Sequence, residues 1–423
     1  MFNKKHFDHV FLPLELSVCH HQIMTVLTKK AKRFFFIAVV VVGLSSCSVH
    51  LPPAGITAYN QCDYSKAIET FSKTPKKEKD SLLYDLALLS VAVHSGDSES
   101  VKKIGLKAQQ QMWGYEGAGR GQASLISSEA IRIYKGEPFE KTMASMYLGI
   151  VYFNEGDYEN AKAAFTKAMF AVQTKGEDSV ADFASPLILL AKTYLKLNDR
   201  DNASVVMNRL EKLIPQNQFD LSALDQIKTI AFVELGKGAK KIRIGPGGSL
   251  VGWQRQPSGE RNAHLRVDGK GSEVFRTMDD LKYQAETVDR GGKTAIQGTK
   301  GVLREASTVT AIIATNEAIN RKNKTAGWVA LGAGLFALAN QSQADVRQWE
   351  LLPDRVLLIL SPDPLTEGRH EFEVEFEGGH WNRYQNQLPS SHQLWYDQRK
   401  ANLDQIYIVR ANSCEKNQKL KGK

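Results

Sequence analysis

Two glutamates three residues apart are the first residues of this sequence that could do chemistry. Glu137 and Glu140, in the stretch GEPFE, could act as a catalytic carboxylate pair. Asp345 and Arg347, in ADVRQW, are a second charged pair, and the four residues together could form the site of a hydrolase between the two halves of the chain. The structural alternative is that Pro138 occupies a first helical turn, where glutamates favour the positive end of the helix dipole. Asp345 and Arg347 would then be a buried ion pair that fixes a domain junction.

Other motifs for catalysis and ligand binding are incomplete. In RGGKT, residues 290–294, the Gly-Lys-Thr end of a phosphate-binding loop lacks its first glycine, because Thr287 stands there. GAGRGQ, residues 117–122, has Gln122 where the third glycine of a dinucleotide-binding loop belongs. His-Glu-x-x-His, Cys-x-x-Cys and Gly-x-Ser-x-Gly do not occur, and His370 stands alone as the expected start of a strand. The sequence therefore predicts no cofactor, no metal and no enzymatic activity.

The best-supported chemistry in the sequence is a covalent lipid at Cys47. The basic residues 29–33 precede an eleven-residue apolar run, Phe34 to Leu44, which is shorter than the roughly 20 residues of a membrane-spanning helix. Basic, apolar and small regions in this order are typical of a signal peptide. The closing LSSC resembles the lipobox of bacterial lipoproteins, which implies cleavage between Ser46 and Cys47 and acylation of Cys47. An ordinary signal peptide with a cleavage site nearby is the alternative.

The lipobox resemblance also predicts a location. Two or three acyl chains would anchor the protein stably to membrane lipid. The residue after Cys47 is Ser48 and not an aspartate. This resembles the pattern for sorting to the outer membrane of a Gram-negative bacterium. We expect the lipid-anchored protein to face the periplasm. Residues 1–46 are then a leader and signal peptide, and because the basic region of a signal peptide is short, we predict Met24 as the true start.

Charge and cysteine usage agree with an exported protein that does not bind nucleic acid. The 423-residue chain has a net charge of +9, and residues 1–46 carry six Lys or Arg and two Asp or Glu, so the mature part is about +5 (9 minus 4). This small, scattered excess does not favour nucleic-acid binding. Apart from the leader and the anchor, Cys62 and Cys414 would be in an oxidising compartment. They could pair as a disulfide, or Cys62 could be a small core residue.

The first half of the mature chain contains paired amphipathic helices with an internal repeat. Units at 145–168 and 184–217 place small residues where two helices cross and aromatic residues around that crossing. These spacings resemble the 34-residue tetratricopeptide repeat. The residues at repeat positions are Leu148, Gly149, Tyr152, Ala161, Phe165, Ala168, Leu187, Leu190, Tyr194, Ala203, Met207, Leu210 and Pro215, with weaker matches at Ala67, Phe71 and Val101. We predict roughly three to five helix pairs in a superhelix with a peptide-binding groove; a generic helical bundle is the alternative.

Two further motifs narrow the resemblance. A Tyr-x-Gly-Glu-x-Phe-Glu stretch begins at Tyr134 and runs into a repeat helix, and ADVRQWELLPDRV, residues 344–356, is followed by GRH at 368–370. In both stretches the chain is similar to an uncharacterised family of bacterial tetratricopeptide-repeat lipoproteins, and this implies architecture without implying a biochemical role. The motif residues are Tyr134, Gly136, Glu137, Phe139, Glu140, Asp345, Arg347, Trp349, Leu352, Pro353, Gly368 and His370.

After residue 236 the composition changes to glycine, proline and basic residues, and alternating strand patterns follow. We expect a hairpin with an Asp-Gly turn at 263–275 and strands at 355–360, 370–378 and 406–410. The apolar helix predicted at 326–339 is either core or a membrane-active or self-associating helix. The predicted segments are leader and signal peptide 1–46, lipidated linker 47–57, helical domain 58–236, linker 237–262, hairpin and helices 263–343, small β-sandwich-like domain 344–410 and basic disordered tail 411–423.

The predicted fold class is therefore α+β, with a helical superhelix followed by a mixed region and a small β unit. The sequence predicts a lipid-anchored envelope protein that acts as a non-catalytic protein–protein interaction scaffold. Its groove would dock an unidentified envelope protein, in cell-envelope assembly. The alternative is a periplasmic hydrolase of envelope polymers with a site between the two halves.

Overall fold

The computed structural model describes residues 50–114, 133–171, 183–213, 220–244, 250–267, 270–271, 273–287, 344–364, 370–376, 380–385 and 404–410. The chain divides into two compact units, residues 1–49 and 50–423, and every described residue belongs to the second. The following predictions fall outside the described residues: the leader with Met24, Ser46, Cys47 and Ser48, the motifs at 117–122 and 290–294, the segment 326–339, Pro215, Gly368, Cys414 and the tail 411–423.

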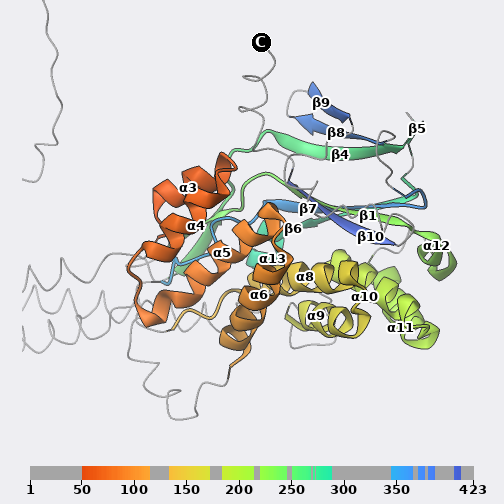
Figure 1. Ribbon diagram of the computed structural model, residues 1–423, viewed down its shortest axis with the longest axis horizontal. Coiled ribbons are helices and arrows are strands. Elements are labelled where there is room, and N and C mark those ends of the chain that lie inside the picture. The colour runs from red at the N-terminus through yellow and green to blue at the C-terminus, as the bar shows by residue number, and fades with distance from the viewer. Residues whose placement is uncertain are drawn as a thin grey trace, which may run out of the picture. The chain divides into compact units, whose positions relative to one another are not determined.

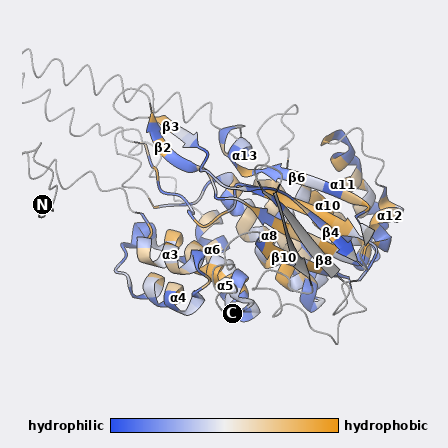
Figure 2. Ribbon diagram, turned by 90° about the horizontal axis from the view of Figure 1, so that it is seen from above, coloured by the Kyte–Doolittle hydropathy of each residue, from blue (hydrophilic) through white to orange (hydrophobic). Residues whose placement is uncertain are grey.

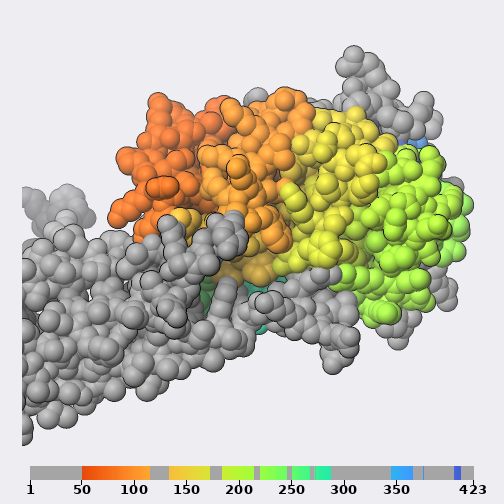
Figure 3. All heavy atoms as spheres, turned by 90° about the horizontal axis from the view of Figure 1, so that it is seen from below, coloured from red at the N-terminus to blue at the C-terminus, as the bar shows by residue number. Residues whose placement is uncertain are grey.

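Four helix pairs make up the first half of the second unit. Figure 1 shows them from red to green, and in Figure 3 their surfaces follow one another as bands from orange to green. The pairs are α3 (Pro53–Asn60) with α4 (Tyr64–Lys73), α5 (Ser81–Ser95) with α6 (Ser98–Trp113), α8 (Pro138–Glu155) with α9 (Tyr158–Ala171), and α10 (Ala184–Lys196) with α11 (Arg200–Leu213). A 3-10 turn, η1 (Glu78–Asp80), precedes α5, and a short helix, α12 (Leu221–Gln226), follows α11.

All four pairs use the same connection between their helices. Each first helix is followed within two residues by one with left-handed backbone. The next residue is an aspartate, which caps the second helix by accepting a hydrogen bond from the backbone N–H three residues later. The left-handed residues are Cys62, Gly96, Gly156 and Asn198, and the capping residues are Asp63, Asp97, Asp157 and Asp199. The pairs are therefore structural repeats, although they are unevenly spaced along the chain.

In two of the pairs the helices cross at a glycine. A Cβ atom added at Gly149 would lie 2.5 Å from the ring of Phe165, and one added at Gly55 would lie 2.5 Å from the ring of Phe71. Both rings are fully buried, so they have no room to withdraw. The α3–α4 pair thus reproduces the crossing of the α8–α9 pair.

The residues at the predicted repeat positions mostly lie between the helices. Those that the structure buries are Leu148, Gly149, Ala161, Phe165, Ala168, Leu187, Leu190, Ala203, Met207, Leu210, Ala67, Phe71 and Val101. Tyr152 and Tyr194 are half-buried. In the second helices the buried residues recur at intervals of three and four, which is the pattern of a helix with one buried face. The first helices α5, α8 and α10 are buried on nearly all sides.

Three sheets follow the helices. The first has the strand order β10–β1–β7–β6, the second is the pair β2–β3, and the third has the order β5–β4–β8–β9. In the first sheet β1 runs parallel to β10 and antiparallel to β7. The strands are β1 (Thr229–Leu235), β2 (Lys240–Ile244), β3 (Leu250–Gln254), β4 (Glu260–Val267), β5 (Lys270–Gly271), β6 (Phe275–Asp280), β7 (Arg355–Ser361), β8 (His370–Phe376), β9 (His380–Gln385) and β10 (Gln405–Arg410), and α13 (Leu281–Thr287) follows β6.

The first sheet is the middle of three layers. One face packs on the third sheet through a core that contains Val233, Leu265 and Ile359. The other face contacts the helices, since β10 packs on α8 and β6 on α10, as Figure 1 shows. All seven residues of β1 are buried as a result. In Figure 2 the orange colour of hydrophobic residues gathers where helices and strands meet, around α8, α10 and β10.

The edge of the first sheet at β10 is covered by a side chain. The Asn154 amide, at the end of α8, donates to the Ile406 carbonyl at 2.7 Å and accepts from the Ile406 N–H at 2.9 Å. These are the two hydrogen bonds that a neighbouring strand would make with that residue. Asn154 therefore takes the place of a further strand at this point.

The structure is α+β as predicted, but several boundaries differ from the prediction. Residues 229–235, expected inside a helical domain through 236, form the central strand β1, because a short apolar run does not distinguish a buried strand from a helix. The predicted linker 237–262 contains the hairpin β2–β3. The β region is not confined to 344–410, since β1, β4 and β6 supply strands to its sheets.

Several strand predictions are confirmed. The chain forms the hairpin β4–β5 around the Asp-Gly turn position, with Arg266 opposite Gly271. Strands β7, β8 and β10 lie at the three predicted places. The helices expected after the hairpin begin with α13 at residue 281, after the additional strand β6.

Candidate functional site

The two charged motifs meet at the start of α8. Glu137 is the N-cap of α8, Pro138 is in its first turn, and Glu137 and Glu140 form a capping box. Gly136, just before, has φ +74°, a left-handed backbone that a residue with a Cβ rarely adopts. The GEPFE stretch thus has the local structure that the structural alternative describes.

Glu140 is fully buried and binds only groups of its own chain. Its Oε1 accepts a hydrogen bond from the Trp349 N–H at 2.6 Å, and its Oε2 accepts from the Tyr134 hydroxyl and from the Glu137 N–H, each at 2.6 Å. Burial, and then the charge of Glu137, raise the pKa of the Glu140 carboxyl. Three donors from three places in the chain converge on this carboxylate, which therefore joins the Tyr134 loop, α8 and the segment around Trp349.

Glu137 is paired with a buried lysine from the β region. Its Oε1 lies 2.5 Å from the Lys241 Nζ, whose side chain is 3% exposed. Burial opposes the charge of this lysine, but Glu137 and other carboxylates raise its pKa, so it remains a cation. Lys241 Nζ also donates to the Arg347 carbonyl at 3.3 Å. The lysine therefore ties β2 to both charged motifs.

Arg347 is held by two aspartates. Its guanidinium binds Asp345 through two nitrogens, at 2.9 and 2.6 Å, and its Nη1 lies 2.7 Å from Asp80 Oδ1 in η1. The side chain is 3% exposed, and the guanidinium stacks 5.4 Å from the centre of the Tyr134 ring. Burial opposes the charge, but Asp345 and then Asp80 raise the pKa of Arg347. A buried planar cation with a fork of carboxylate partners is the geometry of a structural ion pair.

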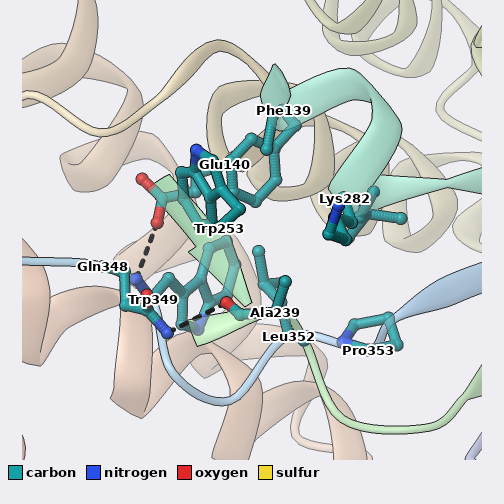
Figure 4. A pocket seen from close by; sticks show the side chains of 12 residues that line it. Phe139, Glu140, Ala239, Trp253, Lys282, Gln348, Trp349, Leu352 and Pro353 are labelled. Carbon is teal, nitrogen blue, oxygen red and sulfur yellow. Dashed lines mark hydrogen bonds between the residues drawn. The ribbon is translucent and has the colours of Figure 1, made fainter. Parts of the chain in front are cut away.

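Trp349 lies against the first helices of two repeats. Its indole N–H donates to the Ser90 hydroxyl of α5 at 2.8 Å, and its ring meets that of Tyr147 in α8 edge to face, with centroids 5.9 Å apart. Figure 4 shows the Trp349 backbone bound to Glu140 and the Gln348 amide reaching the Ala239 carbonyl. Residues 344–353, which we call the tie segment, thus lie across α5, α8 and β2.

The pocket beside the tie segment is too small for a substrate. It is lined by Phe139, Glu140, Gly238, Ala239, Trp253, Leu281, Lys282, Ala285, Gln348, Trp349, Leu352 and Pro353 (Figure 4). Its cavity volume is about 10 Å³, which is room for about one water molecule, whereas small-molecule sites enclose roughly 300 Å³ or more. The motif residues Phe139, Leu352 and Pro353 therefore act here as packing residues.

A second buried polar network was missed by the sequence reasoning. Glu234 of β1, 2% exposed, accepts hydrogen bonds from the Tyr147 hydroxyl at 2.6 Å and lies 3.0 Å from His94 Nε2 in α5. The other ring nitrogen of His94 lies 3.0 Å from the Tyr59 hydroxyl. Burial opposes the negative charge of the Glu234 carboxylate, but His94 and Tyr147 lower the pKa of Glu234. The available signal was a single carboxylate in the apolar run TIAFVEL and a histidine in the apolar stretch of α5.

The comparison with protein families concerns the helical half. Residues 148–169 and 184–217 match the family model of the tetratricopeptide repeat. These two stretches are similar to tetratricopeptide repeats. No curated protein matches the chain at a significant level.

The tie segment and β1 contact the first helices of two of the helix pairs. In such arrays the concave face commonly binds extended partners, and here the first helices, α5 and α8, contact Trp349, Glu234 and Phe232 of the same chain. The groove expected to dock an envelope protein therefore stays a prediction.

The part of the chain that the structure describes contains neither a group of three potential metal ligands nor a helix long and apolar enough to cross a membrane. His370 is the first residue of β8, opposite Val267. Cys62 is disulfide-bonded, while Cys414, the partner considered above, lies outside the described residues.

Proposed function

We propose that the protein is a lipid-anchored envelope protein that acts as a non-catalytic scaffold for another protein. The match to the tetratricopeptide repeat carries this proposal, because such repeats commonly bind proteins. The charged motifs support it, since the Glu140 carboxylate binds the Trp349 N–H and the Arg347 guanidinium binds Asp80, both within the same chain.

In this proposal the signal peptide is cleaved before Cys47, and a lipid on Cys47 anchors the protein in the outer membrane. The protein faces the periplasm. The disulfide at Cys62 supports export, since disulfides persist in oxidising compartments. Cys47→Ser should release the protein from the membrane fraction or leave an uncleaved precursor. Cys19→Ser in the leader is the matched control and should change neither processing nor attachment. Normal processing with unchanged attachment of the Cys47 variant would refute the anchor.

The partner in this proposal binds the outer faces of the second helices. Each of these helices carries at least one large apolar side chain that is exposed: Ile68, Leu106, Phe170 and Val205, at 44, 50, 52 and 66%, with Trp113 at the end of α6 at 44%. Apolar groups on repeat faces are the side chains that a protein partner would bury.

The test is affinity purification from solubilised envelopes. The wild type should recover a reproducible envelope protein, and the double variant Phe170→Glu, Val205→Glu should lose it. Ile244→Glu on β2 is the matched control, because Ile244 is also 44% exposed but lies outside the repeats. Equal recovery by both variants would refute the docking face, and recovery of no partner by the wild type would refute the scaffold.

The alternative function, a hydrolase acting near Glu137, Glu140, Asp345 and Arg347, is tested by alanine substitution of Asp345 and Arg347. We expect Arg347→Ala to lower the free energy of unfolding by about 3–5 kcal/mol, because it leaves buried carboxylates without their cation. Loss of cellular function at unchanged thermal stability would instead favour a catalytic site.

A further inference from the structure

The strand β6 is an open edge of the first sheet. It pairs with β7 on one side, and among the described residues no strand pairs with its other side. Met278, in its second half, is 39% exposed, and Val274, just before it, is 54% exposed. An exposed edge with apolar side chains is a template for pairing with another strand.

The hydrogen-bonding parity of β6 can be read from its end. The Leu281 N–H donates to the Asp354 carbonyl opposite it, so the odd-numbered residues of β6 point their N–H and C=O groups toward β7. The even-numbered residues Arg276, Met278 and Asp280 therefore point theirs outward. Their side chains share one face, on which Arg276 binds Asn262 of β4.

We propose that β6 pairs antiparallel with β6 of a second copy of this chain, about a two-fold axis through Met278. The two four-stranded sheets then join edge to edge. This inference stands independently of the scaffold function.

The register follows from parity and charge. Outward-pointing residues must pair with outward-pointing residues, and a two-fold axis through Met278 places Arg276 of each copy opposite Asp280 of the other. Centring the axis on Arg276 or on Asp280 would instead place like charges opposite each other, which destabilises a strand pair. Within its own chain Asp280 already pairs with Arg255, and Arg276 lies 3.7 Å from Glu273. Both side chains are still about one-third exposed, at 34 and 33%, so the contact across the axis adds to these pairs.

The exposed apolar side chains agree with the same axis. The two Met278 side chains meet at the centre. Val274 of one copy lies beside the start of α13 of the other, where Tyr283 is 47% exposed. Three exposed apolar residues thus come together in one self-complementary patch, as a two-fold interface requires.

The first test uses full-length chains in mild detergent and a short bis-maleimide cross-linker. Met278→Cys should give a covalent dimer in high yield, because the two Cα atoms of a hydrogen-bonded pair are about 5.5 Å apart. Val205→Cys is the matched control, since Val205 is 66% exposed but lies on α11. Cross-linking of Met278→Cys no greater than that of the control would overturn the proposal.

The second test measures mass by sedimentation. The wild type should contain two chains per particle, and Met278→Lys should weaken the dimer by at least about tenfold, since it places two cations on the axis. Its circular dichroism and melting temperature should match the wild type. A single-chain wild type, or an undiminished dimer of a folded Met278→Lys variant, would overturn the pairing.

The third test fixes the register. Arg276→Glu and Asp280→Lys should each be folded and monomeric, because each brings like charges together across the axis. Mixed in equal amounts they should form a heterodimer, in which Glu faces Lys and Asp faces Arg. Monomers in the mixture, or dimers of either variant alone, would refute the register.

Discussion

The carboxylate of Glu140 allows the sharpest test of the structural role that we assign to the charged motifs. Its two oxygens accept three hydrogen bonds in a fully buried place. In Glu140→Gln one oxygen becomes an NH₂ group, which cannot accept. At least one donor, the Trp349 N–H or the pair on Oε2, then loses its acceptor and faces another donor.

The expected cost follows from those contacts. One buried donor without a partner costs about 1–3 kcal/mol, so Glu140→Gln should lower the free energy of unfolding by that amount. Glu140→Ala removes all three acceptor contacts and should cost about 3–5 kcal/mol. The order wild type, Gln, Ala is as important as the magnitudes, because it follows from the number of donors left unpaired.

Urea unfolding followed by circular dichroism measures these differences. Glu159→Gln is the matched control, because Glu159 is also in the first turn of a helix but its side chain is 69% exposed. It should change the free energy by less than about 0.5 kcal/mol. If both Glu140 variants were as stable as the control, the carboxylate would not hold the tie segment and the reasoning would fail.

Three further predictions concern other parts of the fold. Gly149→Ala should cost about 1–3 kcal/mol in urea unfolding, because its Cβ would lie 2.5 Å from the Phe165 ring, whereas Gly105→Ala, whose Cβ meets Leu148 at 3.4 Å, should be tolerated; equal effects would refute the crossing. The folded pKa of Glu234 lies below its ordinary value of 4.5, so its contribution to stability is present above that pH and is lost as pH falls through the folded pKa; Glu234→Gln should therefore flatten the acid limb of a stability–pH curve, and an unchanged limb would contradict this. Cys62 should be linked to Cys414 in peptide mapping without reductant, because Arg410, four residues before Cys414, hydrogen-bonds Asn60 at 2.9 Å; a peptide with free Cys414 would show that the pairing is wrong.

The parts of the fold that could be predicted are those in which local patterns decide. The small residues at the helix crossings, the Gly-Asp turns and the alternating strand of residues 370–376 are local signals. β1 could not be assigned, because the side chains of TIAFVEL are buried on both faces and have no period. Its strand identity depends on β7 and β10, which come more than 100 residues later.

The candidate site divides in the same way. The capping box of α8 is a local motif, and GEPFE predicted it. No spacing rule could show that Trp349 would donate to Glu140, 209 residues away, or that Lys241 would pair with Glu137. The groove was predicted from the repeats alone, and the repeat pattern contains no information about which helix faces the rest of the chain contacts, such as the contact of Trp349 with α5.

The Asn154 amide, which takes the place of a strand at Ile406, limits how large an assembly of this protein can become. A sheet with two open edges can add copies without end, and such growth produces fibres. In the described part of the first sheet, β10 is covered at Ile406 and β6 is open. If copies join through β6, each copy uses its one open edge in the first contact. An assembly that grows only through the first sheet then closes at two chains.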